Sequence, residues 1–301
     1  MLFGRDKKSD SKTVLILDIE NGSVGSALIK LEPGKAPGFL GSWREHMPVH
    51  AARGAESLAE ETRKIISALL PRLSLEAVRN GGVSEVAVFM SPPWGRPNLE
   101  SGRPDFVPHL QEMLAREASP YFGGPLNFYT SAGAAAQGLR ALLPYEDKYL
   151  LCVVTHEMTE LLLIYNGAVA GHASMPHGVN LPLRTLKTHG GLSEPEARSL
   201  LRLGHGGGAA RALDSSTEYY AEEFKNAARE LLDAYVPQQV WVVSPAGEYF
   251  ARALSHESLS DLFPQGGVVR ALRPRHFEQH LPGSPQDLFL ILEALYLRYT
   301  L

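Results

Sequence analysis

The sequence contains a single cysteine, no long apolar run and no excess of positive charge. Cys152 lies in the apolar run YLLCVV, so a disulfide within the chain is excluded and the thiol is expected to be buried, as suits a reducing cytosol. No apolar run approaches the ~20 residues that a membrane-spanning helix needs. The net charge of −4 gives no overall basic field for nucleic acid. We therefore expect a cytoplasmic protein without a transmembrane segment and without nucleic acid as a partner.

The length and composition are those of a folded protein with more than one core. The chain has 301 residues, of which 44% are hydrophobic and 21% charged, as is typical of soluble globular proteins. We expect disorder only at the ends, with a flexible N-terminal tail over residues 1–12.

Two blocks of the sequence follow the same plan. In the first, apolar β-branched runs at 14–19 and 24–31 flank Asn21-Gly22, which is a hairpin turn signal. In the second, the runs YLLCVV and LLLIY precede another turn, and predicted helices follow each block. Duplicated hairpins followed by helices predict an α/β protein with two lobes and a cleft between them.

We assign residues 13–172 to the first lobe and 173–301 to the second. A Pro/Gly-rich stretch interrupts the regular pattern of the first block, and the family resemblance described below implies an inserted subdomain at about 50–124.

The first hairpin carries small and polar residues at its turn: Asp18, Asn21, Gly22 and Ser23 within LDIENGSVGSALIKL. Backbone N–H groups and hydroxyls in such a turn can surround a phosphate. A hairpin that only packs the lobe stays open as the alternative.

The order of the segments resembles the actin/Hsp70/sugar-kinase superfamily, and within it the FtsA/PilM-like branch. The resemblance rests on LDIENGSVGSALIKL as a first phosphate loop, on YTSAGAAAQGLRALLPYEDKYLLCVV leading to a second, and on THEMTELLLIYNGAVAGHASMPHGVNLPLRTLKTHGGLSEPEARSLL after it. It covers about two thirds of the chain. It implies a two-lobed actin-like fold, which is a duplicated ribonuclease H-like fold, with a small subdomain inserted in the first lobe.

The resemblance also implies a set of nucleotide-site residues. Asp18 matches the acidic residue near the metal-bound nucleotide. The other matching positions contact phosphates, ribose or base, and they are Asn21, Gly22, Ser23, Thr159, Glu160, Gly178, Glu222, Lys225, Ser244 and Gly247. ATP and Mg²⁺ are the cofactors implied.

All three nucleotide loops depart from the family pattern. Glu20 replaces a glycine and adds a negative charge where a triphosphate would approach. The second loop, THEMTE, has no glycine and no leading aspartate, although the backbone must come close to the phosphates there. Pro245 removes one N–H from the loop on the adenine side. We expect weak or absent ATP binding and a pseudo-ATPase.

The leading hypothesis is an adaptor or scaffold of a membrane-associated pilus-assembly or cell-division machine. The resemblance implies a partner such as the cytoplasmic tail of a membrane protein, at the inner face of the membrane, and self-association stays open. The competing hypothesis is an ATP-binding actin-like ATPase or kinase with an altered site. The sequence contains no G-x-S-x-G motif, so it gives no support to a hydrolase of another kind.

Overall fold

The computed structural model describes residues 11–49, 54–203, 210–232, 236–255, 259, 262–263 and 267–300. Most of the expected N-terminal tail, residues 1–10, lies outside this part of the chain. Lys12, the last residue assigned to the tail, already begins the first strand.

The first lobe is built on a mixed five-stranded sheet. Its strands, in spatial order, are β3 (Gly38–His46), β2 (Ser23–Leu31), β1 (Lys12–Ile19), β4 (Glu85–Met90) and β7 (Leu126–Thr130). The first three strands form an antiparallel meander, and β4 and β7 continue the sheet in parallel. The expected hairpin around Asn21-Gly22 is present between β1 and β2.

The second lobe repeats this topology. Its strands, in spatial order, are β10 (Ala168–Met175), β9 (Thr159–Tyr165), β8 (Lys148–Val154), β11 (Gln239–Val243) and β12 (Val268–Ala271). Again three antiparallel strands are extended by two parallel ones. The α/β class and the duplicated two-lobed arrangement are therefore confirmed.

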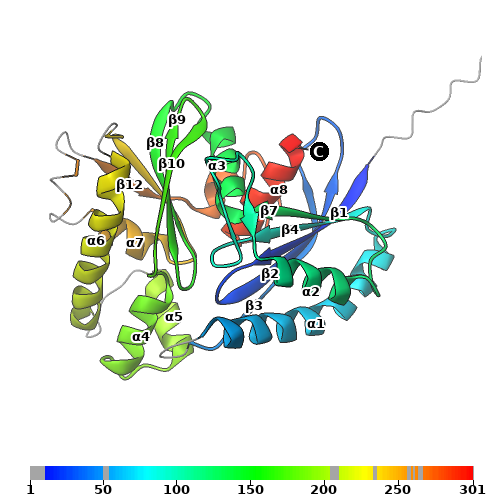
Figure 1. Ribbon diagram of the computed structural model, residues 1–301, viewed down its shortest axis with the longest axis horizontal. Helices are drawn as coiled ribbons and strands as arrows, with labels where there is room; N and C mark the ends of the chain where they lie inside the picture. Colours follow the sequence, from blue (N-terminus) through cyan, green and yellow to red (C-terminus); the bar gives the residue numbers. More distant parts are fainter. Residues whose placement is uncertain are drawn as a thin grey trace, which may run out of the picture.

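Helices form layers on both faces of each sheet, as Figure 1 shows. In chain order the helices are α1 (Ala55–Arg79), α2 (Pro108–Ala118), α3 (Ser131–Leu142), α4 (Asn180–Thr188), α5 (Glu194–Leu203), α6 (Ala210–Leu232), α7 (Gly247–Ala253), the short 3-10 helix η2 (Pro274–Phe277) and α8 (Leu288–Thr300). Helices α1 and α2 cover the outer face of the first sheet, and α4 to α7 cover that of the second. Helices α3 and α8 lie between the two sheets.

The alternation of side chains along the central strands produces these layers. In β1, Val14 and Ile16 face α8, whereas Leu15 and Leu17 face α1 and α2. Successive side chains of a strand point to opposite faces, so a strand buried on both sides is apolar throughout.

Helix α8 is buried on almost every side because it packs between both sheets. Leu288, Leu290, Leu292 and Leu295 are all among its buried residues, as expected for a helix that closes the core. Across the described ranges, no helix combines the length and apolarity that crossing a membrane requires.

Two domain boundaries differ from expectation. Residue 172 falls inside β10, and the second sheet begins at β8, so residues 148–172 belong to the second lobe. The range 50–124 includes β4, a central strand of the first sheet. In that range α1 packs on the sheet, and the segment between β4 and β7 forms the β5–β6 ribbon (Gly95–Arg96 and Asp105–Phe106) and α2.

Candidate functional site

The turn between β1 and β2 is closed by its own backbone and anchored by Asn21. The Glu20 N–H donates to the Ser23 carbonyl at 3.0 Å, and the Met47 N–H donates to the Gly22 carbonyl at 2.9 Å. The Asn21 amide donates to the Pro92 carbonyl at 2.8 Å. Two donors of the turn, the Glu20 N–H and the Asn21 side-chain amide, are therefore already bonded to protein carbonyls.

The first loop lies directly against the second loop, between β8 and β9. The Asn21 amide donates to Thr155 Oγ1 at 3.2 Å, and the Glu157 N–H donates to Asn21 Oδ1 at 2.8 Å. A Cβ added to Gly22 would lie 2.3 Å from His156 Cβ. The absence of a Cβ at Gly22 therefore allows the two loops to lie in close contact.

A single arginine from β3 gathers the carboxylates beside this contact. Arg44 Nη2 lies 2.5 Å from Asp18, Nη1 lies 2.8 Å from Glu20, and Nε lies 2.5 Å from Asp287 at the start of α8. Nη1 also donates to Ser23 Oγ at 2.7 Å. Asp18, expected as the metal partner, is thus fully buried and ion-paired.

Burial decides the protonation of these groups. It raises the pKa of Asp18 and of Glu20 to about 7, even though Arg44 acts in the opposite direction. Burial also raises the pKa of Glu293 well above its usual range. It lowers the pKa of His156 to about 3, so the imidazole is neutral at pH 7, and its Nδ1 shares a hydrogen bond of 2.8 Å with Glu20 Oε2.

The raised pKa of Glu20 predicts a pH-dependent contribution to stability. Because the folded protein holds this proton more tightly than the unfolded chain, the contribution is complete below about pH 4.5 and is lost as the pH rises through about 7. The low pKa values of His46 and His156 act in the opposite direction. The quantity to measure is therefore the difference in unfolding free energy between the wild type and Glu20→Gln, from urea titrations. We expect this difference to fall between pH 5 and pH 8, and a rise would contradict the assignment.

Three more residues that the resemblance assigns to the nucleotide site lie around the second loop, where they contact other protein groups. They are Gly178, Thr159 and Glu160. A Cβ on Gly178 would lie 2.3 Å from the Thr155 carbonyl, and this close approach lets the Val179 N–H donate to that carbonyl. Thr159 Oγ1 donates to the His177 carbonyl at 2.6 Å. Glu160 is buried, with Oε1 3.2 Å from His172 Nε2. The turn is thus held by protein groups.

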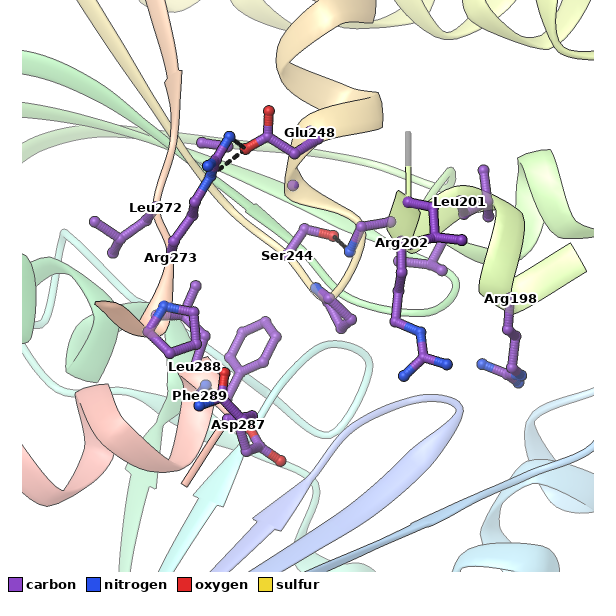
Figure 2. Close-up of a pocket in the computed structure, with 18 of the residues that line it drawn as sticks. Arg198, Leu201, Arg202, Ser244, Glu248, Leu272, Arg273, Asp287, Leu288 and Phe289 are labelled. Carbon is purple, nitrogen blue, oxygen red and sulfur yellow. Dashed lines mark hydrogen bonds and ion pairs between the residues drawn. The ribbon is translucent and has the colours of Figure 1, made fainter. Parts of the chain in front are cut away.

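A cavity of about 1020 Å³ opens beside these loops, mainly in the second lobe (Figure 2). Ser244 and Gly247, from the turn between β11 and α7, are among the residues that line it. Glu222 and Lys225 are not among its lining residues. They lie on α6, which turns Tyr220 and Phe224 toward the core.

No protein-family model matches the sequence, and no curated protein matches it. Solved structures do match. The PilM–PilN type IV pilus biogenesis complex is 14% identical, with a TM-score of 0.64 over 95% of this chain and 98% of that one. Ethanolamine utilization protein EutJ from Carboxydothermus hydrogenoformans is 14% identical, with a TM-score of 0.59 over 96% and 89%. The activator of 2-hydroxyisocaproyl-CoA dehydratase from Clostridium difficile, with bound ADPNP, is 12% identical, with a TM-score of 0.52 over 96% and 95%. The chain has the actin-like fold.

ATP and Mg²⁺, which the actin-like fold implies, do not fit the loops as they stand. The first loop contacts the second without space for phosphates, and Gly22 lies against His156. Asp18 is neutralised by Arg44 rather than open to a cation. Among the described residues, no group of three His, Cys, Asp or Glu side chains could hold a metal ion.

Sequence reasoning missed three residues of this actin-like site: Arg44, His156 as a hydrogen-bonding group, and Asp287. The available signal for Arg44 was Gly25, a glycine inside an apolar strand. Gly25 pairs with Arg44 across β2 and β3, and a Cβ there would lie 2.6 Å from Arg44 Nη2. A glycine within a strand often marks a close approach of this kind.

Proposed function

We propose that this chain is a PilM-like scaffold that binds a protein partner and does not turn over ATP. The observation that carries the proposal is the direct contact between the two loops, with Arg44 holding Asp18 and Glu20 beside it. Phosphoryl transfer depends on a positioned metal and a phosphate cradle. Both are replaced here by bonds between protein groups.

The fold supports a partner at a membrane-associated machine. The matched structure is a PilM–PilN complex of type IV pilus biogenesis. Its matched chain and the present chain align over nearly their full lengths. By analogy, we propose the cytoplasmic tail of a membrane protein as the partner, in a pilus-assembly or cell-division machine at the inner face of the membrane.

The test combines partner binding with phosphate release. We expect a synthetic peptide of the partner's cytoplasmic tail to bind this chain, with a dissociation constant that changes less than about twofold when Mg-ATP is added. We also expect phosphate release from Mg-ATP to equal that of an Asp18→Asn variant whose folding is checked by circular dichroism. Phosphate release above that of Asp18→Asn would contradict the proposal.

The cavity supports a second candidate, an ATP-binding ATPase or kinase with an altered site. Its volume of about 1020 Å³ could accommodate a nucleotide-sized ligand, and Ser244 and Gly247 line it. Calorimetry with Mg-ATP distinguishes the candidates, since only this one requires binding that depends on Mg²⁺.

A further inference from the structure

The second sheet ends at a strand that has one neighbouring strand. In the part of the chain that the structure describes, β12 pairs with β11 alone and forms the edge opposite β10 (Figure 1). The Val268 N–H donates to the Gln238 carbonyl at 2.8 Å. In a parallel ladder alternate residues bond to the same neighbour, so the backbone N–H and C=O groups of Val269 and Ala271 point away from β11. These groups can pair with an added strand.

A hollow of about 450 Å³ lies along this edge of the sheet. Val269, Arg270 and Ala271 of β12 line it, together with Trp241 of β11. Val268, at the start of β12, is 47% exposed. An extended segment that pairs with β12 would therefore run along the hollow.

Arginines reach the hollow from both faces of the sheet. Arg270 lies 5.6 Å from the centre of the Trp241 ring, on the face that packs against α8. Arg252 comes from α7, which packs on the opposite face. Arg275 comes from η2 and lines the same hollow. A strand added to β12 would thus meet guanidinium groups on either side.

The positive charge of the hollow exceeds what its acidic residues neutralise. Glu248 is the one acidic side chain among the lining residues, and it binds Arg273. Within the described ranges, the three other arginines that line the hollow have no carboxylate partner. They are Arg252, Arg270 and Arg275. Positive charges gathered in a concave surface attract anions strongly, so the edge favours an acidic partner.

The geometry points to a docking site for an extended acidic segment of a partner protein. The segment adds a sixth strand to the second sheet, pairing with the backbone of Val269 and Ala271 while its carboxylates bind Arg252, Arg270 and Arg275. A second copy of this chain fits less well, because pairing two β12 edges would bring their arginines together. The site does not rest on the proposed function, since neither of the two contacting loops is part of it.

The test is fluorescence anisotropy with the full chain and a labelled peptide of repeated Glu-Glu-Val, long enough to span β12. Consecutive glutamates point to opposite faces of a strand, so both sets of arginines are reached. We expect saturable binding, and at least about tenfold weaker binding of the same peptide with methylated backbone nitrogens, which keeps the charge but cannot pair as a strand. Absence of peptide binding, equal affinity for the methylated peptide, or tighter binding of a single-stranded DNA oligonucleotide would overturn the proposal.

Amide hydrogen exchange locates the bound peptide. Saturating peptide should slow exchange of the Val269 and Ala271 amides by at least about tenfold, whereas amides of the opposite edge strand β10 should change less than about twofold. Unchanged exchange in β12, or equal slowing in both edge strands, would contradict strand addition at this edge.

Matched variants separate the site from a general charge effect. The test variant replaces three arginines of the hollow: Arg252→Gln, Arg270→Gln and Arg275→Gln. The control variant replaces three exposed arginines of the first lobe: Arg96→Gln, Arg103→Gln and Arg116→Gln. With folding checked by circular dichroism, the test variant should weaken peptide binding by at least about tenfold and the control by less than about twofold. Equal effects would overturn the proposal, as would a wild-type dimer in light scattering that the test variant abolishes, because the surface would then bind a second copy.

Discussion

Replacing Arg44 with methionine is expected to lower the free energy of unfolding by about 3–5 kcal/mol, because breaking a buried ion pair leaves charges uncompensated. The Arg44 side chain is 12% exposed, and three of its nitrogens bind Asp18, Glu20 and Asp287. Methionine fills a similar volume but has no charge and no N–H group to donate to the carboxylates. Urea denaturation followed by circular dichroism measures the loss.

The loss should depend on pH and on the carboxylates. At pH 5 Asp18 and Glu20, whose pKa values burial raises to about 7, are largely protonated, so the loss should be smaller than at pH 8. Adding Asp18→Asn and Glu20→Gln to Arg44→Met should recover about half of the lost free energy at pH 8. A loss below about 1 kcal/mol at pH 8, or no recovery, would show that Arg44 does not hold the cluster.

The fold could be predicted because the hydrophobic pattern is local and repeated. The apolar runs that became β1, β2, β8 and β9 each precede or follow a turn signal, and the two blocks specify the same meander. Such patterns are local properties of the chain.

The lobe boundary could not be predicted because strand pairing is not local. Strand β8 follows α3 directly along the chain, yet it pairs with β11, and Leu150 lies opposite Val240. Helix α3 packs against both sheets, so the sequence shows no break between the lobes. The pairing of distant parallel strands decides where the second lobe begins.

The departures of these loops from the family pattern could be read from the sequence, but the contacts that their residues make could not. The glutamate at position 20 and the absence of glycine in THEMTE are visible in the sequence. Arg44, however, lies 24 residues from Glu20 and 243 residues from Asp287. Only the antiparallel pairing of β3 with β2, which sets Arg44 opposite Gly25, and the position of α8 between the sheets bring these groups together.

Because the two loops are in contact at Gly22, the variant Gly22→Ala is expected to destabilise the protein. The new Cβ would lie 2.3 Å from His156 Cβ and 2.6 Å from Cγ, and neither atom is the far end of a flexible chain. Overpacking of this kind costs about 1–3 kcal/mol, so the variant should be destabilised by that amount in urea titrations.

A double-mutant cycle with His156→Gly identifies the contact as the cause. His156→Gly alone removes the imidazole bond to Glu20 and should destabilise the protein, but it also removes the atoms that Gly22→Ala would meet. The double variant should therefore be more stable than the sum of the single losses, with a coupling energy of about 1–3 kcal/mol. Without coupling, the loops would be apart in solution and the space for phosphates would be open. In that case the ATP-binding alternative, rather than the scaffold, would account for the site.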